Sequence, residues 1–193
     1  VFIMKNTENK KYILTDEVKF FRFNSAVTVA LHQIKAIRDF GDVKAGNLGG
    51  WVEDEKNLSH DGDCWIYDNA KVYDNAKIFN NAKIYDDARV FDSAEIYNHA
   101  EICDNARVFD NAVVGGDARV YSGAWVFDEA HIYDNVKIHG DAKIYGFARV
   151  FDDAKVFGNA EVYDNAKIQG TASIYGDVHI RNKSIISGDA EIR

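Results

Sequence analysis

The sequence predicts an all-β fold in which one chain coils into a parallel solenoid, and three regularities support this. From Cys64 onward, an aliphatic residue recurs every six positions, and all 22 of these positions hold Ile or Val. The position two residues earlier is Ala in 18 of the 22 units. The second residue after each aliphatic position is Asp, Asn or Gly in 20 of 21 units. A short fixed period over this length is the signature of a repeat architecture.

Each six-residue unit has the chemistry of one short strand followed by one corner. In Ala-Lys-Ile-Tyr, alternate side chains point to opposite faces of a strand, so Ala and Ile share one face and Lys and Tyr the other. Small and β-branched residues suit the inside of a narrow core of extended strands. Asp, Asn and Gly tolerate the left-handed backbone conformation of a tight corner. We therefore expect an aliphatic inside and an aromatic and basic outside.

Units such as residues 66–71 resemble the hexapeptide repeat of left-handed parallel β-helices. That resemblance implies a left-handed coil of three units, so that 22 units make about seven triangular coils in a prism about 34 Å long. Upstream, segments 37–46, 49–52, 58–59 and 62–68 are similar to the amino-terminal part of YdcK-like hexapeptide proteins of bacteria and phages. This second resemblance implies a transferase-like fold, and the family brings no established reaction.

Residues 1–60 lack the six-residue period, and we expect them to form a small N-terminal β cap on a repeat domain of residues 61–193. Alternating apolar residues predict three strands in this cap, with a turn at 24–25. The expected strands are 12–14, 18–23 and 27–31. Such a cap would block the open edge of the first coil. Met4 is the sole methionine, and we expect it to be the native start.

Aromatic residues follow 15 of the 22 aliphatic positions, and a spacing of 18 residues sorts them into three outward columns. One column has six consecutive rings and is the expected self-association face: Tyr73, Phe91, Phe109, Phe127, Tyr145 and Tyr163. Six rings could expose several hundred Å², which is the scale of a binding patch. This interpretation predicts a homo-oligomer, either a dimer or a trimer. The alternative is that the rings only stack on neighbouring strands and stabilise the sheet.

The repeat is acidic, and its carboxylates concentrate at the corners. The chain has 31 acidic and 23 basic residues and a net charge of −8; residues 61–193 hold 23 of the acidic and 14 of the basic residues. The candidate acidic corners are Asp68, Asp74, Asp86, Asp92, Asp104, Asp110, Asp128 and Asp134. Turn chemistry alone explains most of them. Alternatively, their rows imitate a nucleic-acid backbone and bind a basic nucleic-acid-binding protein, whereas the negative charge argues against direct nucleic-acid binding.

We expect no catalytic residue, cofactor or metal ion. Calcium ligands must converge, whereas the corner carboxylates point outward from a convex edge. Resemblance to the hexapeptide acyltransferases, which use a His as general base between subunits, makes His139 a weak candidate base. His139 replaces an outward ring, and a tolerated surface substitution is the favoured explanation. No loop interrupts residues 64–193 to build an acceptor site.

Two cysteines cannot build a disulfide framework, and no apolar stretch approaches the roughly 20 residues of a spanning helix. A cytoplasmic protein without membrane contact is therefore expected. The preferred function is a non-catalytic, acidic interaction protein. The resemblance to phage proteins implies a sharper hypothesis, the inhibition of a host defence protein such as a CRISPR nuclease by direct binding. The alternative is a hexapeptide-type acyltransferase with its site between subunits.

Overall fold

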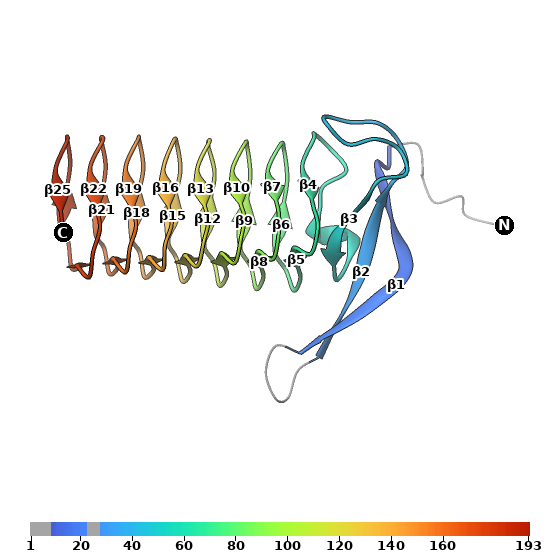
Figure 1. Ribbon diagram of the computed structural model, residues 1–193, viewed down its shortest axis with the longest axis horizontal. Coiled ribbons are helices and arrows are strands. Elements are labelled where there is room, and N and C mark those ends of the chain that lie inside the picture. The colour runs from blue at the N-terminus through green and yellow to red at the C-terminus, as the bar shows by residue number, and fades with distance from the viewer. Residues whose placement is uncertain (1–8, 23–27) are drawn as a thin grey trace.

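A parallel β-solenoid with a long hairpin at one end makes up the structure, which is a computed structural model (Figure 1). It describes residues 9–22 and 28–193. Met4 and the expected turn at 24–25 lie outside the described residues. The described chain contains one short helix, the 3₁₀ turn η1 (Glu55–Asn57), and is otherwise built of strands and corners. The predicted all-β single-chain solenoid is confirmed, with about eight turns.

The first of three sheets has ten strands and includes the hairpin. The hairpin pairs β1 (Tyr12–Arg22) with β2 (Thr28–Ala36), and β2 is also antiparallel to β3 (Leu48–Val52). From β3 onward the pairing is parallel. The later strands of this sheet are, in order, β5 (Lys71–Val72), β8 (Arg89–Val90), β11 (Arg107–Val108), β14 (Trp125–Val126), β17 (Lys143–Ile144), β20 (Glu161–Val162) and β23 (His179–Ile180).

The second and third sheets are wholly parallel and form the other two sides of the solenoid. The second sheet contains β4 (Trp65–Ile66), β7 (Lys83–Ile84), β10 (Glu101–Ile102), β13 (Arg119–Val120), β16 (Lys137–Ile138), β19 (Lys155–Val156), β22 (Ser173–Ile174) and β25 (Glu191–Ile192). The third sheet contains β6 (Lys77–Ile78), β9 (Glu95–Ile96), β12 (Val113–Val114), β15 (His131–Ile132), β18 (Arg149–Val150), β21 (Lys167–Ile168) and β24 (Ile185–Ile186).

Paired strands lie three repeat units apart in the chain. Lys71 pairs with Arg89 and Val72 with Val90, and the same register repeats along all three sheets. The inward Ala, Ile and Val side chains are fully buried through most of the repeat and form one continuous core. The predicted division into an aliphatic inside and an aromatic and basic outside is therefore confirmed.

Every corner of the repeat turns on a residue in the left-handed backbone conformation. All 21 residues at the first corner position have φ between 50° and 78°, from Asp68 at 50° to Gly176 at 78°. Ser122, the one residue here that is not Asp, Asn or Gly, adopts φ 60° as well. The corner chemistry predicted from the sequence is confirmed, and it sets the polar side chains in regular rows along the corners.

The first coil is built from residues upstream of the six-residue period. Trp51 and Val52 of β3 pair in parallel with Lys71 and Val72, and Leu58 forms a bridge to the third sheet. Parallel stacking thus begins before the boundary expected at residue 61, which is why about eight turns form where seven were expected. The period does not reveal this coil because the corner between Leu58 and Ile66 is two residues longer than the others, which puts Val52 and Leu58 out of phase with the repeat.

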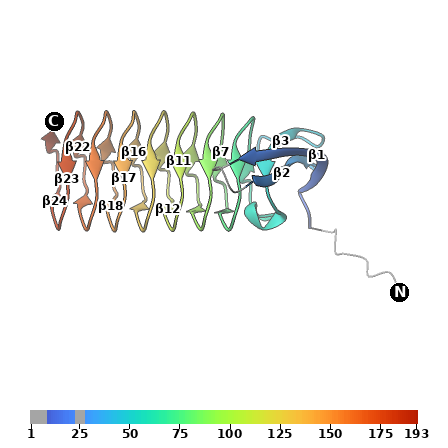
Figure 2. The same cartoon turned by 90° about the horizontal axis from the view of Figure 1, so that it is seen from below.

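The hairpin turns back from the end of the solenoid and lies across the outer face of the first sheet (Figure 2). The strand expected at 12–14 and most of the one expected at 18–23 are a single strand, β1, with a register shift between Leu14 and Val18. On β2, the side chains of Val29 and Leu31 are buried against the aromatic column of the first sheet. Part of that column is consequently covered by the chain itself.

Candidate functional site: the acidic ridge and the aromatic columns

Four aspartates on successive coils form a continuous row, here called the acidic ridge: Asp74, Asp92, Asp110 and Asp128. They occupy the corner between the first and third sheets, each with a positive φ. Each carboxylate accepts a hydrogen bond from the backbone N–H of the next coil; Asp110 N–H donates to Asp92 Oδ2 at 3.3 Å, and Asp128 N–H to Asp110 Oδ2 at 3.3 Å. The aspartates of the row therefore stabilise the corners by accepting backbone hydrogen bonds, and they also concentrate negative charge along one edge of the solenoid.

The other predicted acidic corners fall into two separate rows. Asp68, Asp86 and Asp104 follow the corner between the second and first sheets, which continues as Ser122. Asp134 lies on the remaining corner. The structure thus brings four of the eight candidates together into the acidic ridge and separates the rest from it.

None of the four aspartates of the acidic ridge forms an ion pair with a Lys or Arg in the described part of the chain. Burial raises the pKa of Asp110, and the like charges of Asp92 and Asp128 raise it further, against the lowering effect of the hydrogen bond from Asp128 N–H. A raised pKa means that the folded protein disfavours the ionised form of the Asp110 carboxyl group. A cation supplied from outside would relieve this repulsion.

An open groove of about 360 Å³ runs beside the acidic ridge. Its walls include Asp110, Asp128, Glu129 and Phe147. The ring of Phe147 is 62% exposed, although most units have Asp or Asn at its position. Carboxylates beside an exposed ring suit a Lys or Arg side chain, whose apolar stem and charged head need both surfaces. Sequence reasoning missed Phe147, although its departure from the corner consensus was visible.

The six rings of the first-sheet column stack face to face. Consecutive centroids are 4.8 to 5.1 Å apart with interplanar angles of 1° to 6°. Each inner ring has both faces covered by its neighbours, so that only ring edges point away from the sheet. The column is thus no platform on which a base or a sugar ring could stack, and this supports a structural role for the rings.

The hairpin removes two of these six rings from the surface. Tyr73 and Phe91 are only 1% and 4% exposed, and they pack with Val29 and Leu31. Phe21 of β1 lies 5.7 Å from Tyr73 between ring centroids. The expectation that all six rings form an accessible face therefore needs correction. The apolar side chains of the hairpin are buried against the first two rings of the column and cover them. The four half-buried rings that remain are Phe109, Phe127, Tyr145 and Tyr163.

His139 belongs to the aromatic column of the second sheet. Its ring is stacked between Tyr121 at 4.8 Å and Phe157 at 4.9 Å. Burial lowers the pKa of His139, and the charge of Lys137 lowers it further. No carboxylate among the described residues orients its ring, so the geometry of a general base is not assembled there.

A different histidine has a carboxylate partner. His99 Nδ1 lies 3.4 Å from Asp117 Oδ1, and its Nε2 lies 3.1 Å from Asn81 Nδ2. His99 borders an open depression of about 370 Å³, together with Lys83 and Glu101. This arrangement favours a proton on Nδ1, with Nε2 accepting a hydrogen bond from the side-chain amide of Asn81. The sequence held a signal for it, because Asp117 follows His99 by one full coil.

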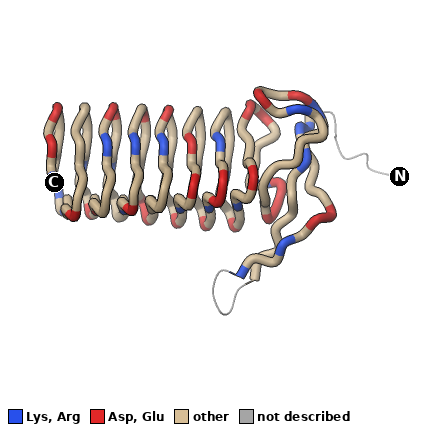
Figure 3. The backbone as a smooth tube through the Cα atoms, in the orientation of Figure 1, with Lys and Arg blue, Asp and Glu red and all other residues tan. Residues whose placement is uncertain are grey.

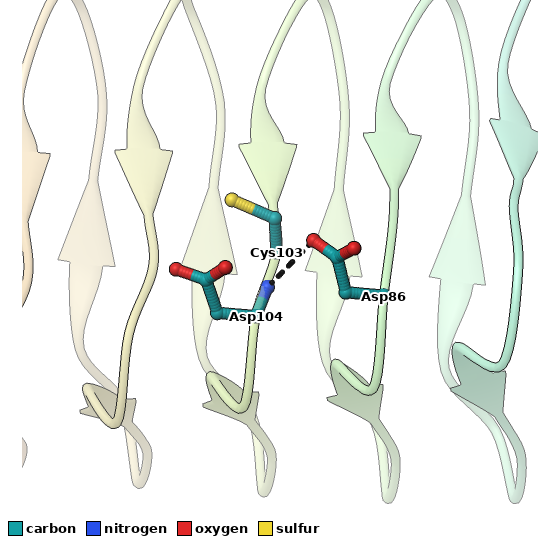
Figure 4. A group of neighbouring side chains, drawn as sticks. All are labelled: Asp86, Cys103 and Asp104. Carbon is teal, nitrogen blue, oxygen red and sulfur yellow. Dashed lines mark hydrogen bonds between the residues drawn. The ribbon is translucent and has the colours of Figure 1, made fainter.

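One cluster of metal-ligand types occurs on the corner between the second and first sheets (Figure 4). Asp86, Cys103 and Asp104 bring ligand atoms within 4.8 Å of one another. Asp86 Oδ2 already accepts the backbone N–H of Asp104 at 3.2 Å. Burial, followed by the charges of Asp104 and Asp86, raises the pKa of the Cys103 thiol to about 11. In the absence of a metal ion the Cys103 thiol therefore keeps its proton at neutral pH.

Comparison with known proteins agrees with this geometry. The family model described as "YdcK Beta solenoid repeat" matches residues 100–116. The repeat is similar to that of YdcK. A curated relative from Escherichia coli (strain K12), named "Uncharacterized acetyltransferase YdcK", is 44% identical over 66 residues. The match covers 33% of this chain and 20% of the relative, so the chain spans about a fifth of the length of the YdcK protein.

The resemblance to YdcK-like proteins that the sequence predicts is confirmed by both matches. The printed name of the relative from Escherichia coli describes an acetyltransferase, and the description of the family model gives a β-solenoid repeat. Among the described residues, no helix has the length and apolar character that crossing a bilayer requires.

Proposed function

We propose that this chain is a non-catalytic interaction protein whose acidic ridge binds a basic surface of another protein. The carrying observation is the row of four aspartates on successive coils, none of which forms an ion pair with a described Lys or Arg. Burial raises the pKa of Asp110, and the like charges of Asp92 and Asp128 add to the rise. A cationic partner would supply the missing counter-charge.

The spacing of the ridge indicates the kind of partner. Successive coils place one carboxylate about every 4.8 Å, whereas one strand of DNA carries one charge about every 3.4 Å along its axis. The ridge thus offers a straight row of negative charge at a similar density. Phe147 adds an exposed aromatic anchor at the end of the groove, and protein interfaces favour such anchors. A nucleic-acid-binding protein fits both features.

The sharper form of this proposal is that the chain is encoded by a phage or prophage and inhibits a host defence protein, such as a CRISPR nuclease. It rests on the resemblance to phage hexapeptide proteins and on the charge row that could occupy a nucleic-acid channel. Cleavage of a DNA target by a purified CRISPR nuclease tests it. The chain should slow cleavage, and a chain that leaves every nuclease tested unaffected would remove this form of the proposal.

The general proposal is tested with two variants of equal net charge. The ridge variant carries Asp92→Asn, Asp110→Asn and Asp128→Asn, which keep a side-chain oxygen for the corner hydrogen bonds and a residue that tolerates positive φ. The control variant carries three exchanges at exposed second corner positions: Asp141→Asn, Asp153→Asn and Asp177→Asn. Immobilised wild type and control should capture the same salt-released nucleic-acid-binding protein from bacterial lysate, and the ridge variant should not. Equal capture by all three would contradict the proposal.

An acyltransferase is the second candidate, and the pair of His99 and Asp117 favours it. A base with an orienting carboxylate beside a polar depression is the arrangement that acyl transfer needs. The printed name of YdcK points to the same reaction class. Thermal-shift measurements with acetyl-CoA test this candidate. A stabilisation that His99→Gln leaves intact, accompanied by acetyl transfer that His99→Gln abolishes, would favour the enzyme over the interaction protein.

A further inference from the structure

The outer face of the second sheet carries a row of three cations, here called the basic column: Arg119, Lys137 and Lys155. They stand at equivalent positions of β13, β16 and β19 and are aligned by parallel register (Figure 3). Neighbouring strands lie about 4.8 Å apart. Like charges on adjacent strands repel one another, so nearby carboxylates would stabilise the basic column.

The chain itself supplies few of these counter-charges. Arg119 pairs with Glu101 at 3.0 Å, whereas Lys137 and Lys155 are exposed and form no ion pair with any residue that the structure describes. One bordering corner carries small neutral residues at its first positions on these coils: Ser122, Gly140 and Gly158. At the corner between the third and second sheets, Asp134 and Asp152 each accept a hydrogen bond from a backbone N–H of the next coil.

The N-terminal half of the same face holds the opposite charge. Its open depression of about 370 Å³ is lined by the carboxylates of Asp42, Asp63 and Glu101. Lys83 also borders the depression, but Asp42 neutralises it through an ion pair of 2.9 Å. Asp63 is exposed, and no described cation forms an ion pair with it. One face therefore carries carboxylates at one end, of which Asp63 has no ion pair with a described cation, and the basic column at the other.

We propose that a second copy of this chain docks antiparallel on the second-sheet face, with the basic column of each copy in the depression of the other. Counted along this face, Asp63 begins the first coil, Glu101 lies on the third, Arg119 on the fourth and Lys155 on the sixth. A two-fold axis between the third and fourth coils brings Lys155 opposite the partner's Trp65, two residues from the partner's Asp63. The same axis places the Arg119–Glu101 pairs of the two copies side by side. Lys137 faces the partner's Lys83, whose charge Asp42 already neutralises. The spacing matches without strain because both rows share the same strand separation.

The shape of the face suits a second copy better than a flexible polyanion. Tyr121, His139, Phe157 and Tyr175 stack at 4.8 to 4.9 Å beside the basic column and present a flat row of ring edges. On the proposed axis this row faces Tyr67 and Tyr85 of the partner subunit, which stack at 4.9 Å, and the rings can form the apolar centre of an interface. A linear polyanion would use only the basic column and leave the depression empty, which gives a way to tell the two apart.

Sedimentation velocity with three charge-reversal variants tests this dimer. Wild type at low salt should sediment as two copies and dissociate in about 0.5 M salt, where charges are screened. Lys155→Glu, which lies near the partner's Asp63, should weaken association at least tenfold, and adding Asp63→Lys to it should restore the dimer. Lys167→Glu, at the equivalent exposed position of the third sheet, is the matched control and should leave the mass unchanged.

Three results would overturn the proposal. A single-copy mass for wild type at low salt would do so, especially if the chain then bound heparin, which would favour a polyanion. Equal loss of the dimer in Lys167→Glu would show that net charge alone matters. Loss of the dimer in Phe127→Ser, with none in Lys155→Glu, would move the contact to the first-sheet column. None of these results bears on the acidic ridge, which lies on the corner opposite this face.

Discussion

The Oδ2 atom of Asp92 accepts a hydrogen bond from the backbone N–H of Asp110, which lies one coil further along the chain, at 3.3 Å. The bond repeats at the next level, where Asp110 accepts from Asp128 N–H. Each aspartate of the acidic ridge thus stabilises the corner that follows it and repels the carboxylate that it helps to hold. The hydrogen bond of each aspartate stabilises the fold, whereas its charge destabilises it. Substitutions that remove only the charge, or both, can test the two contributions separately.

Asp110→Asn should leave the fold intact and raise stability slightly at neutral pH. The amide oxygen can still accept from Asp128 N–H, and Asn tolerates the positive φ of this corner. Because the folded state raises the pKa of Asp110, its stabilising contribution is present at low pH and is lost as the pH rises through that pKa. Chemical denaturation should therefore show the variant at or slightly above wild type at pH 7, and no such gain at pH 3.

A clear loss of stability in Asp110→Asn at pH 7 would mean that the charge itself strengthens the corner bond. Asp110→Ala provides the complementary control, since it removes the acceptor along with the charge and brings a residue that disfavours positive φ. It should destabilise the protein by about 1–2 kcal/mol.

Phe109→Ala should destabilise the solenoid by about 2–3 kcal/mol. Phe109 stacks on Phe91 and on Phe127, each at 4.9 Å, so the substitution opens the column at its middle. Gln169→Ala, at the equivalent outward position of the third sheet, is the control and should change stability by less than about 0.5 kcal/mol. Equal midpoints for the two variants in a urea titration would argue against a structural column.

Gly50→Ala should destabilise the junction between the hairpin and the first coil. A Cβ there would lie 2.6 Å from Ile66 Cγ2 and 2.7 Å from Ala70 O, so backbone must move to admit it. The expected loss is about 1–3 kcal/mol, measured by thermal unfolding. Gly123→Ala serves as control, because its Cβ would meet chiefly the side-chain tip of Asp141, which can rotate away.

His139→Phe should change the pH dependence of stability more than stability itself. Burial lowers the pKa of His139 in the folded state, so its contribution is present above the unfolded pKa and is lost as the pH falls below it. Phe keeps the stack with Tyr121 and Phe157 and cannot gain a proton. Urea midpoints should be similar at pH 8, with the variant ahead at pH 5.5. A parallel shift at both values would contradict this account of His139.

Most of the repeat could be predicted from the sequence because its determinants are local. The alternation of Ala and Ile sets the inside, and corner residues such as Asp68 set positive φ, so strands, core and columns follow from six-residue chemistry. The pair of His99 and Asp117 was equally accessible, since residues 18 positions apart are neighbours on adjacent coils.

The path of the hairpin could not be predicted in the same way. Its contact with Tyr73 and Phe91 depends on how β1 and β2 turn back over the first sheet, which no short-range pattern records. The first coil also escaped notice, because the corner between Leu58 and Ile66 is two residues longer than the period, so Val52 and Leu58 stack in register but lie out of phase with the repeat. Both features rest on packing between segments far apart in the chain, and the first of them decides which rings remain exposed.

The most direct test of the acidic ridge is the titration of a fluorescent arginine-rich peptide, followed by anisotropy. Wild type and the control variant (Asp141→Asn, Asp153→Asn, Asp177→Asn) should bind with similar affinity. The ridge variant (Asp92→Asn, Asp110→Asn, Asp128→Asn) should bind at least tenfold more weakly, which corresponds to about 1.4 kcal/mol. Equal weakening in the two variants would show that net charge rather than the row of carboxylates attracts cations, and would contradict the account.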